Sequence, residues 1–182
     1  MNIFLGLPLP EEFRHLLIDF LLQKHPSWKD HRDIRWTLPA SHHITLHFFG
    51  AVAVLDLKDL ITALADSLLN FPSFQVAMTK IDNFPEKKSN LVASYTRLSA
   101  NLAQLYHLIE QTVAQHHFPK EQRPYLPHVT LCRSRKNNLL TMEPIFLADI
   151  LVPISSVILY QTQATAQGSV YHALAAWQLK SK

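Results

Sequence analysis

One four-residue pattern, His-x-Thr-Leu, occurs twice in the chain. It begins at His43, with Thr45, and again 85 residues later at His128, with Thr130. Histidine titrates near neutral pH, so two histidines can supply a general acid and a general base. Threonine hydroxyls can donate hydrogen bonds to the non-bridging oxygens of a phosphate. The repeated motif therefore indicates phosphodiester chemistry by acid–base catalysis, without need of a metal.

The spacing within each motif also predicts how these side chains are presented. In a strand, residues i and i+2 point to the same face, so His43 projects with Thr45 and His128 with Thr130. Two such strands side by side aim two imidazoles and two hydroxyls at one pocket. A cyclic phosphate suits this set, because one histidine activates water and the other protonates the departing ribose oxygen. The alternative is two ordinary strand histidines in a core, which the duplication with threonine disfavours.

Two residues near the motifs have positions that depend on strand regularity. His47 shares the parity of His43 and Thr45, so it is a candidate for lining the cleft and contacting substrate, and a solvent-facing or supporting position is the alternative. Arg133 has the opposite parity to His128. It reaches the cleft as an anion-binding residue only by its length, a β-bulge or an early strand end.

Further candidates are Arg123, Phe48 and Tyr160. Arg123 either binds an anion or pairs with a nearby acid. Tyr160 and Phe48 can stack on a base, but core packing is the favoured expectation for Phe48. A metal site built from His42, His43 and His47 is disfavoured, since three histidines on one strand do not all face one ion. No metal and no cofactor is expected.

Composition excludes several classes of protein. The 182 residues carry a net charge of +3, which permits an anionic ligand but is far from a nucleic-acid-coating stripe. Only three glycines occur, so the glycine-rich phosphate loops of nucleotide-binding folds are absent. The single cysteine excludes an internal disulfide. With neither a signal peptide nor an apolar run long enough to span a membrane, we expect a soluble cytoplasmic protein.

Hydrophobic periodicity predicts a mixed α+β architecture with a mostly antiparallel sheet. Helices are expected from Pro10 to His25, over 56–70, and after a cap at Ser99. Strands are expected over 2–7, 34–37, 43–49, 74–81, 91–96, 128–132, 145–152, 157–162 and 170–177. No linker of biased composition interrupts the chain, so residues 1–182 are expected to form one compact domain.

The sequence resembles the 2H phosphoesterases, and within them the RNA 2′,3′-cyclic phosphodiesterases, also called 2′-5′ RNA ligases. The resemblance runs nearly end to end. It rests on IFLGL at residues 3–7, Arg35-Trp36, HITLHFFG at 43–50, Phe84-Pro85, RPYLPHVTLCR at 123–133, LYQ at 159–161, and Gly168 with Tyr171. The two His-x-Thr motifs are specific as a pair and weak singly.

This resemblance implies two pseudo-symmetric lobes of mainly antiparallel sheet with outer helices and a central cleft. It implies metal-independent hydrolysis of the 2′,3′-cyclic phosphate at an RNA end to a 2′-phosphate, with possible reversal as 2′-5′ ligation. His43 would be the proton donor, His128 the acceptor, and Thr45 and Thr130 would bind phosphate. Arg133 matches a family arginine that holds the anion. From the residues alone, the donor and acceptor labels are exchangeable.

Other functions remain open at this point. One is a related reaction on 2′-5′ oligonucleotides or small cyclic nucleotides, and another is a non-catalytic module that binds RNA ends. A histidine metal-binding protein is a fourth hypothesis. The expected partners are RNA cyclic-phosphate termini or small cyclic-phosphate nucleotides, with no membrane and no obligate protein partner.

Overall fold

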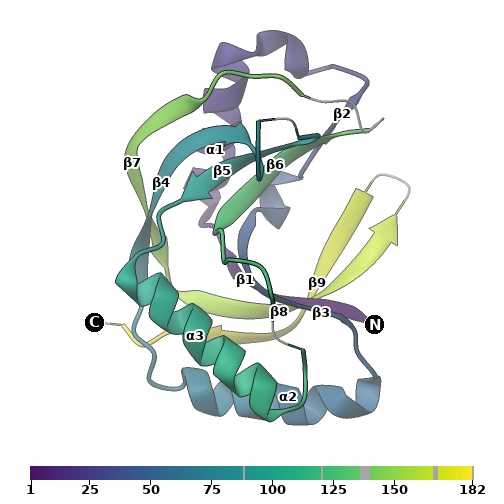
Figure 1. The fold of residues 1–182 in the computed structure, drawn as a ribbon, viewed down its shortest axis with the longest axis vertical. Coiled ribbons are helices and arrows are strands. Elements are labelled where there is room, and N and C mark those ends of the chain that lie inside the picture. The colour runs from purple at the N-terminus through teal and green to yellow at the C-terminus, as the bar shows by residue number, and fades with distance from the viewer. Residues whose placement is uncertain (88, 120, 136–139, 166–167, 182) are drawn as a thin grey trace.

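The fold is described from a computed structural model. It covers residues 1–182 except 88, 120, 136–139, 166–167 and 182. Within these described residues, three α-helices and nine strands follow one another in a mixed order (Figure 1). The helices are α1 (Glu11–Lys24), α2 (Val54–Leu68) and α3 (Ala100–Gln115). The strands are β1 (Asn2–Pro8), β2 (Ile34–Trp36), β3 (His43–Ala51), β4 (Phe74–Asn83), β5 (Leu91–Thr96), β6 (His128–Ser134), β7 (Ile145–Ile154), β8 (Ser156–Thr165) and β9 (Gly168–Gln178).

The strands of the sheet are arranged pseudo-symmetrically about its centre. Its strand order is β7-β4-β5-β6-β3-β1-β8-β9, with β2 paired to β6 off this path, and all of these pairings are antiparallel. The two motif strands, β3 and β6, therefore lie at the centre as neighbours. Each is flanked by a three-strand ladder, β5-β4-β7 on one side and β1-β8-β9 on the other. This arrangement confirms the α+β class with two pseudo-symmetric lobes.

The two halves of the sheet meet through very little backbone pairing. Between β3 and β6 the register contains one residue pair, Ile44 opposite Val129. Both side chains are completely buried. Leu131 is completely buried as well, and Leu46 is almost so. The motif strands are thus anchored by the apolar residues that alternate with the histidines and threonines, and they diverge on either side of this contact.

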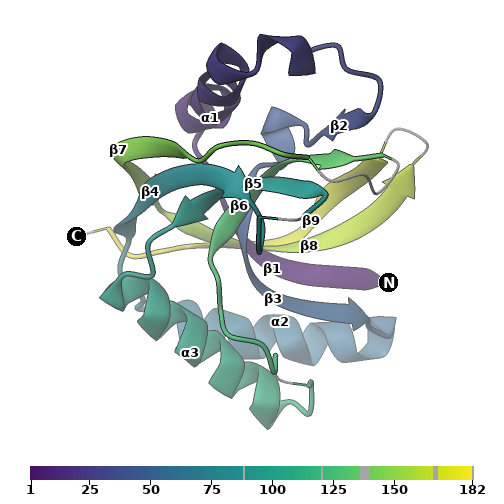
Figure 2. The ribbon, with the colours of Figure 1, turned by 45° about the horizontal axis from the view of Figure 1, so that its top comes forward.

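The helices begin where the local sequence favours them. Pro10 precedes α1, whose first turn carries Glu11 and Glu12 at its positive end. The Ser99 side chain accepts a hydrogen bond from the Leu102 amide at 3.3 Å and caps α3, as predicted. In both views α2 and α3 lie side by side on one side of the molecule, and α1 lies on the opposite side (Figures 1 and 2).

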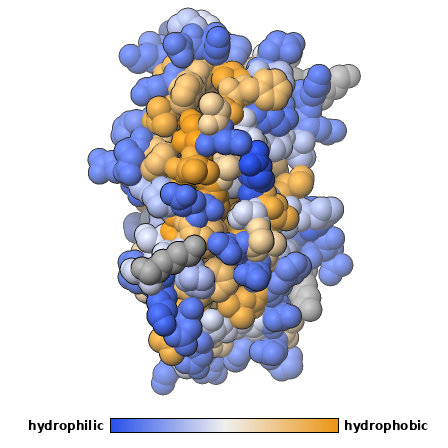
Figure 3. All heavy atoms as spheres, turned by 90° about the vertical axis from the view of Figure 1, so that its left-hand side faces the viewer, coloured by the Kyte–Doolittle hydropathy of each residue, from blue (hydrophilic) through white to orange (hydrophobic). Residues whose placement is uncertain are grey.

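Strand β7 forms one edge of the sheet. It exposes Phe146 and Leu151, and apolar side chains gather in a vertical band on this side of the molecule (Figure 3). Pro153 lies within the strand, where an edge tolerates a residue that donates no backbone hydrogen bond. Among the described residues no helix is long and apolar enough to cross a bilayer.

Candidate active site

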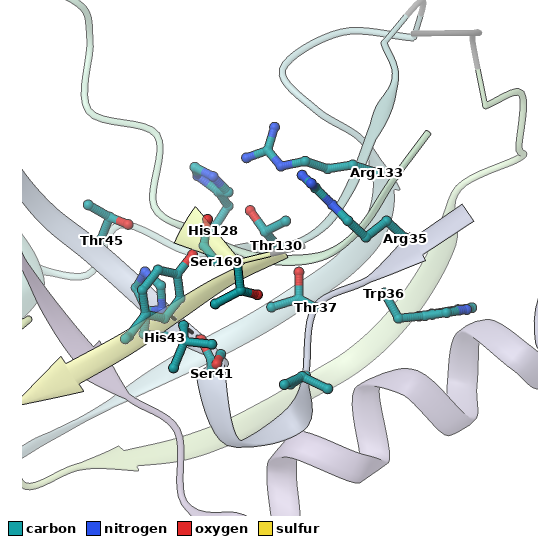
Figure 4. A pocket seen from close by; sticks show the side chains of 14 residues that line it. Arg35, Trp36, Thr37, Ser41, His43, Thr45, His128, Thr130, Arg133 and Ser169 are labelled. Atoms are coloured by element: carbon teal, nitrogen blue, oxygen red, sulfur yellow. Dashed lines mark hydrogen bonds between the residues drawn. The ribbon is translucent and has the colours of Figure 1, made fainter. Parts of the chain in front are cut away.

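A cavity of about 500 Å³ opens where the two motif strands diverge (Figure 4). It brings together the four motif residues that the sequence analysis singled out, His43, Thr45, His128 and Thr130. The other described residues in its lining are Arg35, Trp36, Thr37, Leu38, Ser41, Arg133, Thr165, Ser169, Val170 and Tyr171. This lining contains two guanidinium groups and several hydroxyls but no carboxylate, so it favours an anionic ligand.

Each motif histidine is held in the same way. The Nδ1 atom of His43 lies 2.7 Å from the Ser41 carbonyl oxygen, and Nδ1 of His128 lies 2.8 Å from that of Leu126. A carbonyl oxygen only accepts, so in both rings Nδ1 carries the proton and donates it. In each neutral imidazole Nε2 is therefore unprotonated and able to accept a proton.

Both imidazoles also pack against aromatic rings. The His128 ring stacks on Phe84 with centroids 3.7 Å apart, and the His43 ring lies 4.7 Å from Phe4 and 5.2 Å from Tyr171. The pKa of His43 is lowered to about 4, mainly by burial and in smaller part by the neighbouring His128. Burial lowers the pKa of His128 as well, with a smaller contribution from Arg133. Both rings are consequently neutral in the free protein at pH 7.

Glycine at position 6 makes room for the His43 ring. Gly6 lies opposite Thr45 in the β1–β3 register, and a Cβ atom there would lie 3.1 Å from His43 Cδ2 and 3.4 Å from Cγ. In the other half of the sheet the corresponding position, opposite Thr130, is Ala93. We call the surroundings of His43 and Thr45 the first half-site and those of His128 and Thr130 the second. The first half-site thus needs a glycine at the position where the second accepts a methyl group.

Two β-bulges change which side chains face the cavity. In β3 the register steps from Thr45 to His47, and in β6 from Thr130 to Cys132, so Leu46 and Leu131 are extra residues at equivalent points. Beyond a bulge the alternation of faces is reversed. Arg133 accordingly faces the cavity, by the bulge that the sequence analysis gave as one possible route.

The corresponding bulge in β3 makes the prediction for His47 wrong. His47 does not line the cleft: it is 3% exposed on the core side, where its Nδ1 donates to Glu110 Oε1 at 2.5 Å. The expectation that Phe48 packs in the core is also wrong, because the residue after the bulge is 62% exposed. Phe48 lies opposite Phe4, on the face that carries His43.

The remaining candidates lie near or outside the cavity. The prediction that Arg123 binds substrate is wrong, because Arg123 is not among the described residues that line the cavity. Its guanidinium binds Glu121 at 2.8 Å, the alternative considered for it, and holds the pKa of that carboxyl down at about 2. Tyr160 is not among the lining residues either. It packs on Phe4 at 5.1 Å and stands 5.9 Å from the His43 ring, where it supports the ring.

Sequence reasoning did not select Arg35 as a site residue. It lies directly opposite Arg133 in the β2–β6 register, and both guanidinium groups extend along the same side of the cavity (Figure 4). Burial and the Arg35 charge lower the pKa of Arg133. In the described part of the chain neither arginine forms an ion pair, and no three His, Cys, Asp or Glu side chains are grouped to hold a metal.

Comparison with known proteins places the chain in a family. Residues 19–165 match the model of the 2′-5′ RNA ligase superfamily, and the chain belongs to this superfamily. A curated relative from Bacillus subtilis strain 168, named RNA 2′,3′-cyclic phosphodiesterase, is 30% identical over 133 residues, which span 72% of this chain and 70% of the relative. The resemblance on which the sequence analysis relied is thereby confirmed.

Solved structures share the fold. A protein of Thermus thermophilus superposes with a TM-score of 0.85 at 20% identity, over 100% of both chains. E. coli LigT, crystallised with 3′-AMP, superposes with a TM-score of 0.78 at 20% identity, over 98% of this chain and 97% of its own. These neighbours support the two-lobed architecture described above.

Proposed function

We propose that the protein hydrolyses 2′,3′-cyclic phosphate at RNA ends to a 2′-phosphate, using the two motif histidines and no metal. The observation that carries the proposal is the pair of imidazoles in one cavity whose described lining holds no carboxylate, each with Nδ1 donating to a backbone carbonyl. The name of the Bacillus subtilis relative and the nucleotide in the LigT crystal support this substrate class.

The reaction follows from the placement of these groups. The Nε2 atom of His128 takes a proton from water, whose oxygen attacks phosphorus. The P–O3′ bond breaks, and the protonated Nε2 of His43 gives its proton to the departing O3′. Thr45, Thr130 and Arg133 bind the phosphate oxygens, and Arg35 adds a further positive charge at the cavity wall. Run in reverse, the same steps expel water from the 2′-phosphate and re-form the cyclic ester. With a 5′-hydroxyl in place of water as the attacking group, breaking of the P–O3′ bond leaves a 2′-5′ linkage.

His43 becomes protonated when the substrate binds. In the free protein the pKa of His43 is about 4, so the ring is neutral at pH 7. A phosphate monoanion beside the ring favours the imidazolium and raises this pKa. The exchange of donor and acceptor labels between His43 and His128 has the same chemistry and is compatible with the same arrangement.

A substrate panel tests the proposal. It compares an RNA oligonucleotide ending in 2′,3′-cyclic phosphate, a 2′-5′-linked oligonucleotide and a mononucleoside 2′,3′-cyclic phosphate, with products identified by ³¹P NMR. We expect turnover of the cyclic-ended RNA to a 2′-phosphate. Turnover of only the 2′-5′ linkage or only the mononucleotide would replace the RNA end with that substrate. Binding without turnover of any ester would leave an RNA-end-binding module.

A further inference from the structure

The side chain of Tyr125 links the two halves of the sheet. It precedes His128 by three residues, yet its hydroxyl donates a hydrogen bond to the backbone carbonyl oxygen of Thr45 at 3.0 Å. Thr45 belongs to the motif on β3, and Tyr125 belongs to the segment that enters the motif strand β6. One hydroxyl thus joins the backbone of the first motif to the segment that precedes the second motif, residues 121–127, which we call the approach segment.

The hydrogen bond lies beside the point where β3 and β6 stop pairing with each other. Strands β3 and β6 pair only at Ile44 and Val129, so one residue later their backbones have separated. The Tyr125 hydroxyl supplies the Thr45 carbonyl with a donor at that point. A hydrogen bond to a backbone carbonyl in this part-buried position favours the folded arrangement of the two segments.

Helix α3 fixes the other end of Tyr125. The ring stacks on Tyr106 of α3 with centroids 4.0 Å apart and an interplanar angle of 6°. One turn further along the helix, Glu110 Oε2 accepts the Glu121 amide at 3.3 Å. The approach segment is therefore fastened to α3 at two points, Glu121 and Tyr125.

The same helix also holds β3. Glu110 uses its second oxygen, Oε1, to accept the Nδ1 proton of His47 at 2.5 Å, and His47 lies two residues after Thr45. The contacts consequently close a ring that runs from Thr45 to Tyr125, Tyr106, Glu110 and His47 and back along β3. His47, which the β3 bulge turns to the core side, is part of this ring.

We infer that Tyr125 is a positioning residue that sets the separation of the two catalytic histidines. The inference rests on the proposed two-histidine reaction. Its hydroxyl fixes the first motif strand against the segment that delivers His128, so that both imidazoles reach one phosphate. Without the hydroxyl, the backbone pairing of β3 with β6 is the Ile44–Val129 pair alone, and the two half-sites separate more easily.

The test compares Tyr125→Phe with Tyr106→Phe. The first variant removes the bridging hydroxyl and keeps the stack, while the second removes a hydroxyl from the opposing ring of the same stack. We expect kcat on a cyclic-ended oligonucleotide to fall about fivefold in Tyr125→Phe, with KM changed less than twofold, because one hydrogen bond is lost at a distance from substrate. Tyr106→Phe should keep kcat within twofold.

A second readout does not depend on activity. Histidine ring resonances are followed by NMR across a pH titration in the wild type and both variants. Looser half-sites weaken the effect of His128 on His43 and admit water, so the pKa of His43 should rise in Tyr125→Phe and stay unchanged in Tyr106→Phe. If the wild type hydrolyses no cyclic phosphate, the proposed reaction fails, and this titration still tests the positioning.

Two outcomes would overturn the inference. One is an unchanged kcat and an unchanged His43 pKa in Tyr125→Phe. The other is an equal change in both variants, which would make the effect one of helix packing and not of the bridging hydroxyl.

Discussion

The two motif strands are built alike up to the bulge and differ beyond it. His43 and Thr45 on β3 correspond to His128 and Thr130 on β6, and both histidines donate from Nδ1 to a carbonyl two residues upstream. After the bulge, β3 exposes Phe48, which is not among the described lining residues, at the position where β6 places Arg133 in the cavity lining. In the proposed reaction the shared part supplies the acid and the base, whereas the divergent part offers an exposed aromatic ring on β3 and a guanidinium group on β6.

The buried sides of the strands differ in the same register. His47 of β3 donates to Glu110, whereas the equivalent Cys132 of β6 is a completely buried thiol whose pKa burial raises to about 12. A thiol with that pKa is neutral and packs as a small apolar side chain. One half therefore fixes its motif strand by a polar network and the other by packing.

The largest expected effect concerns what the halves share. His43→Ala and His128→Ala should each lower kcat by at least ~100-fold, because each removes a general acid or base. Steady-state kinetics on a cyclic-ended oligonucleotide measures this, with His15→Ala on the exposed face of α1 as the matched control. Retention of the rate within a few-fold in either variant would show that the half-sites are not equivalent in chemistry.

The next effect concerns what the halves do not share. Arg133→Ala should raise KM about 10- to 100-fold, the loss of a charged hydrogen bond to phosphate. Phe48→Ala should raise KM only about fivefold, the low end for one base–aromatic stack. Arg123→Ala is the control, since Arg123 pairs with Glu121 outside the cavity. An equal rise of KM in the Arg133 and Arg123 variants would make the effect one of general charge.

A smaller effect separates Gly6 from its counterpart Ala93. Gly6→Ala should lower kcat about 3- to 10-fold, because the new methyl group displaces the His43 ring by a few tenths of an ångström. Ala93→Gly should leave kcat unchanged and cost about 0.5–1 kcal/mol of stability, as glycine does within a strand. Kinetics and thermal unfolding measured on both variants distinguish the two results. Unchanged kcat in Gly6→Ala would show that the ring tolerates the methyl group.

The smallest expected effect is a displacement along the pH axis. The kcat/KM profile reports the free enzyme, in which the pKa values of His43 and His128 are both lowered. One ring must be protonated and the other neutral, so this profile should be a bell with its maximum below pH 6.5. Bound phosphate raises both pKa values, so the kcat profile should lie at higher pH. A kcat/KM maximum above 6.5 would contradict the burial of the two rings.

The sequence predicted the repeated part of the site and gave a bulge as one route for Arg133, but it misplaced the β3 residues that follow the bulge. Strand alternation was sufficient for His43, Thr45, His128 and Thr130, because those residues precede Leu46 and Leu131. Beyond these bulges the period of two placed His47 and Phe48 on the wrong faces. Nothing in the local sequence marks an extra residue in a strand, since a bulge is fixed by the partner strand's register.

Long-range pairing explains the other omissions. Arg35 joins the cavity because the three-residue strand β2 pairs with the end of β6, which puts it opposite Arg133. Tyr125 reaches Thr45 across 80 residues of sequence. In contrast, elements set by local patterns were predicted well: α2 begins two residues earlier than expected, and α3 starts after Ser99 as expected.

The central claim of the proposed reaction is that side chains from both halves of the sheet carry out the chemistry without a metal. Its most direct test is the initial rate of hydrolysis of a cyclic-ended oligonucleotide with excess EDTA and without it, after the protein has been stripped of metal. We predict the same rate within twofold and a 2′-phosphate as the product. Loss of turnover with EDTA, restored by a divalent cation, would contradict the proposal.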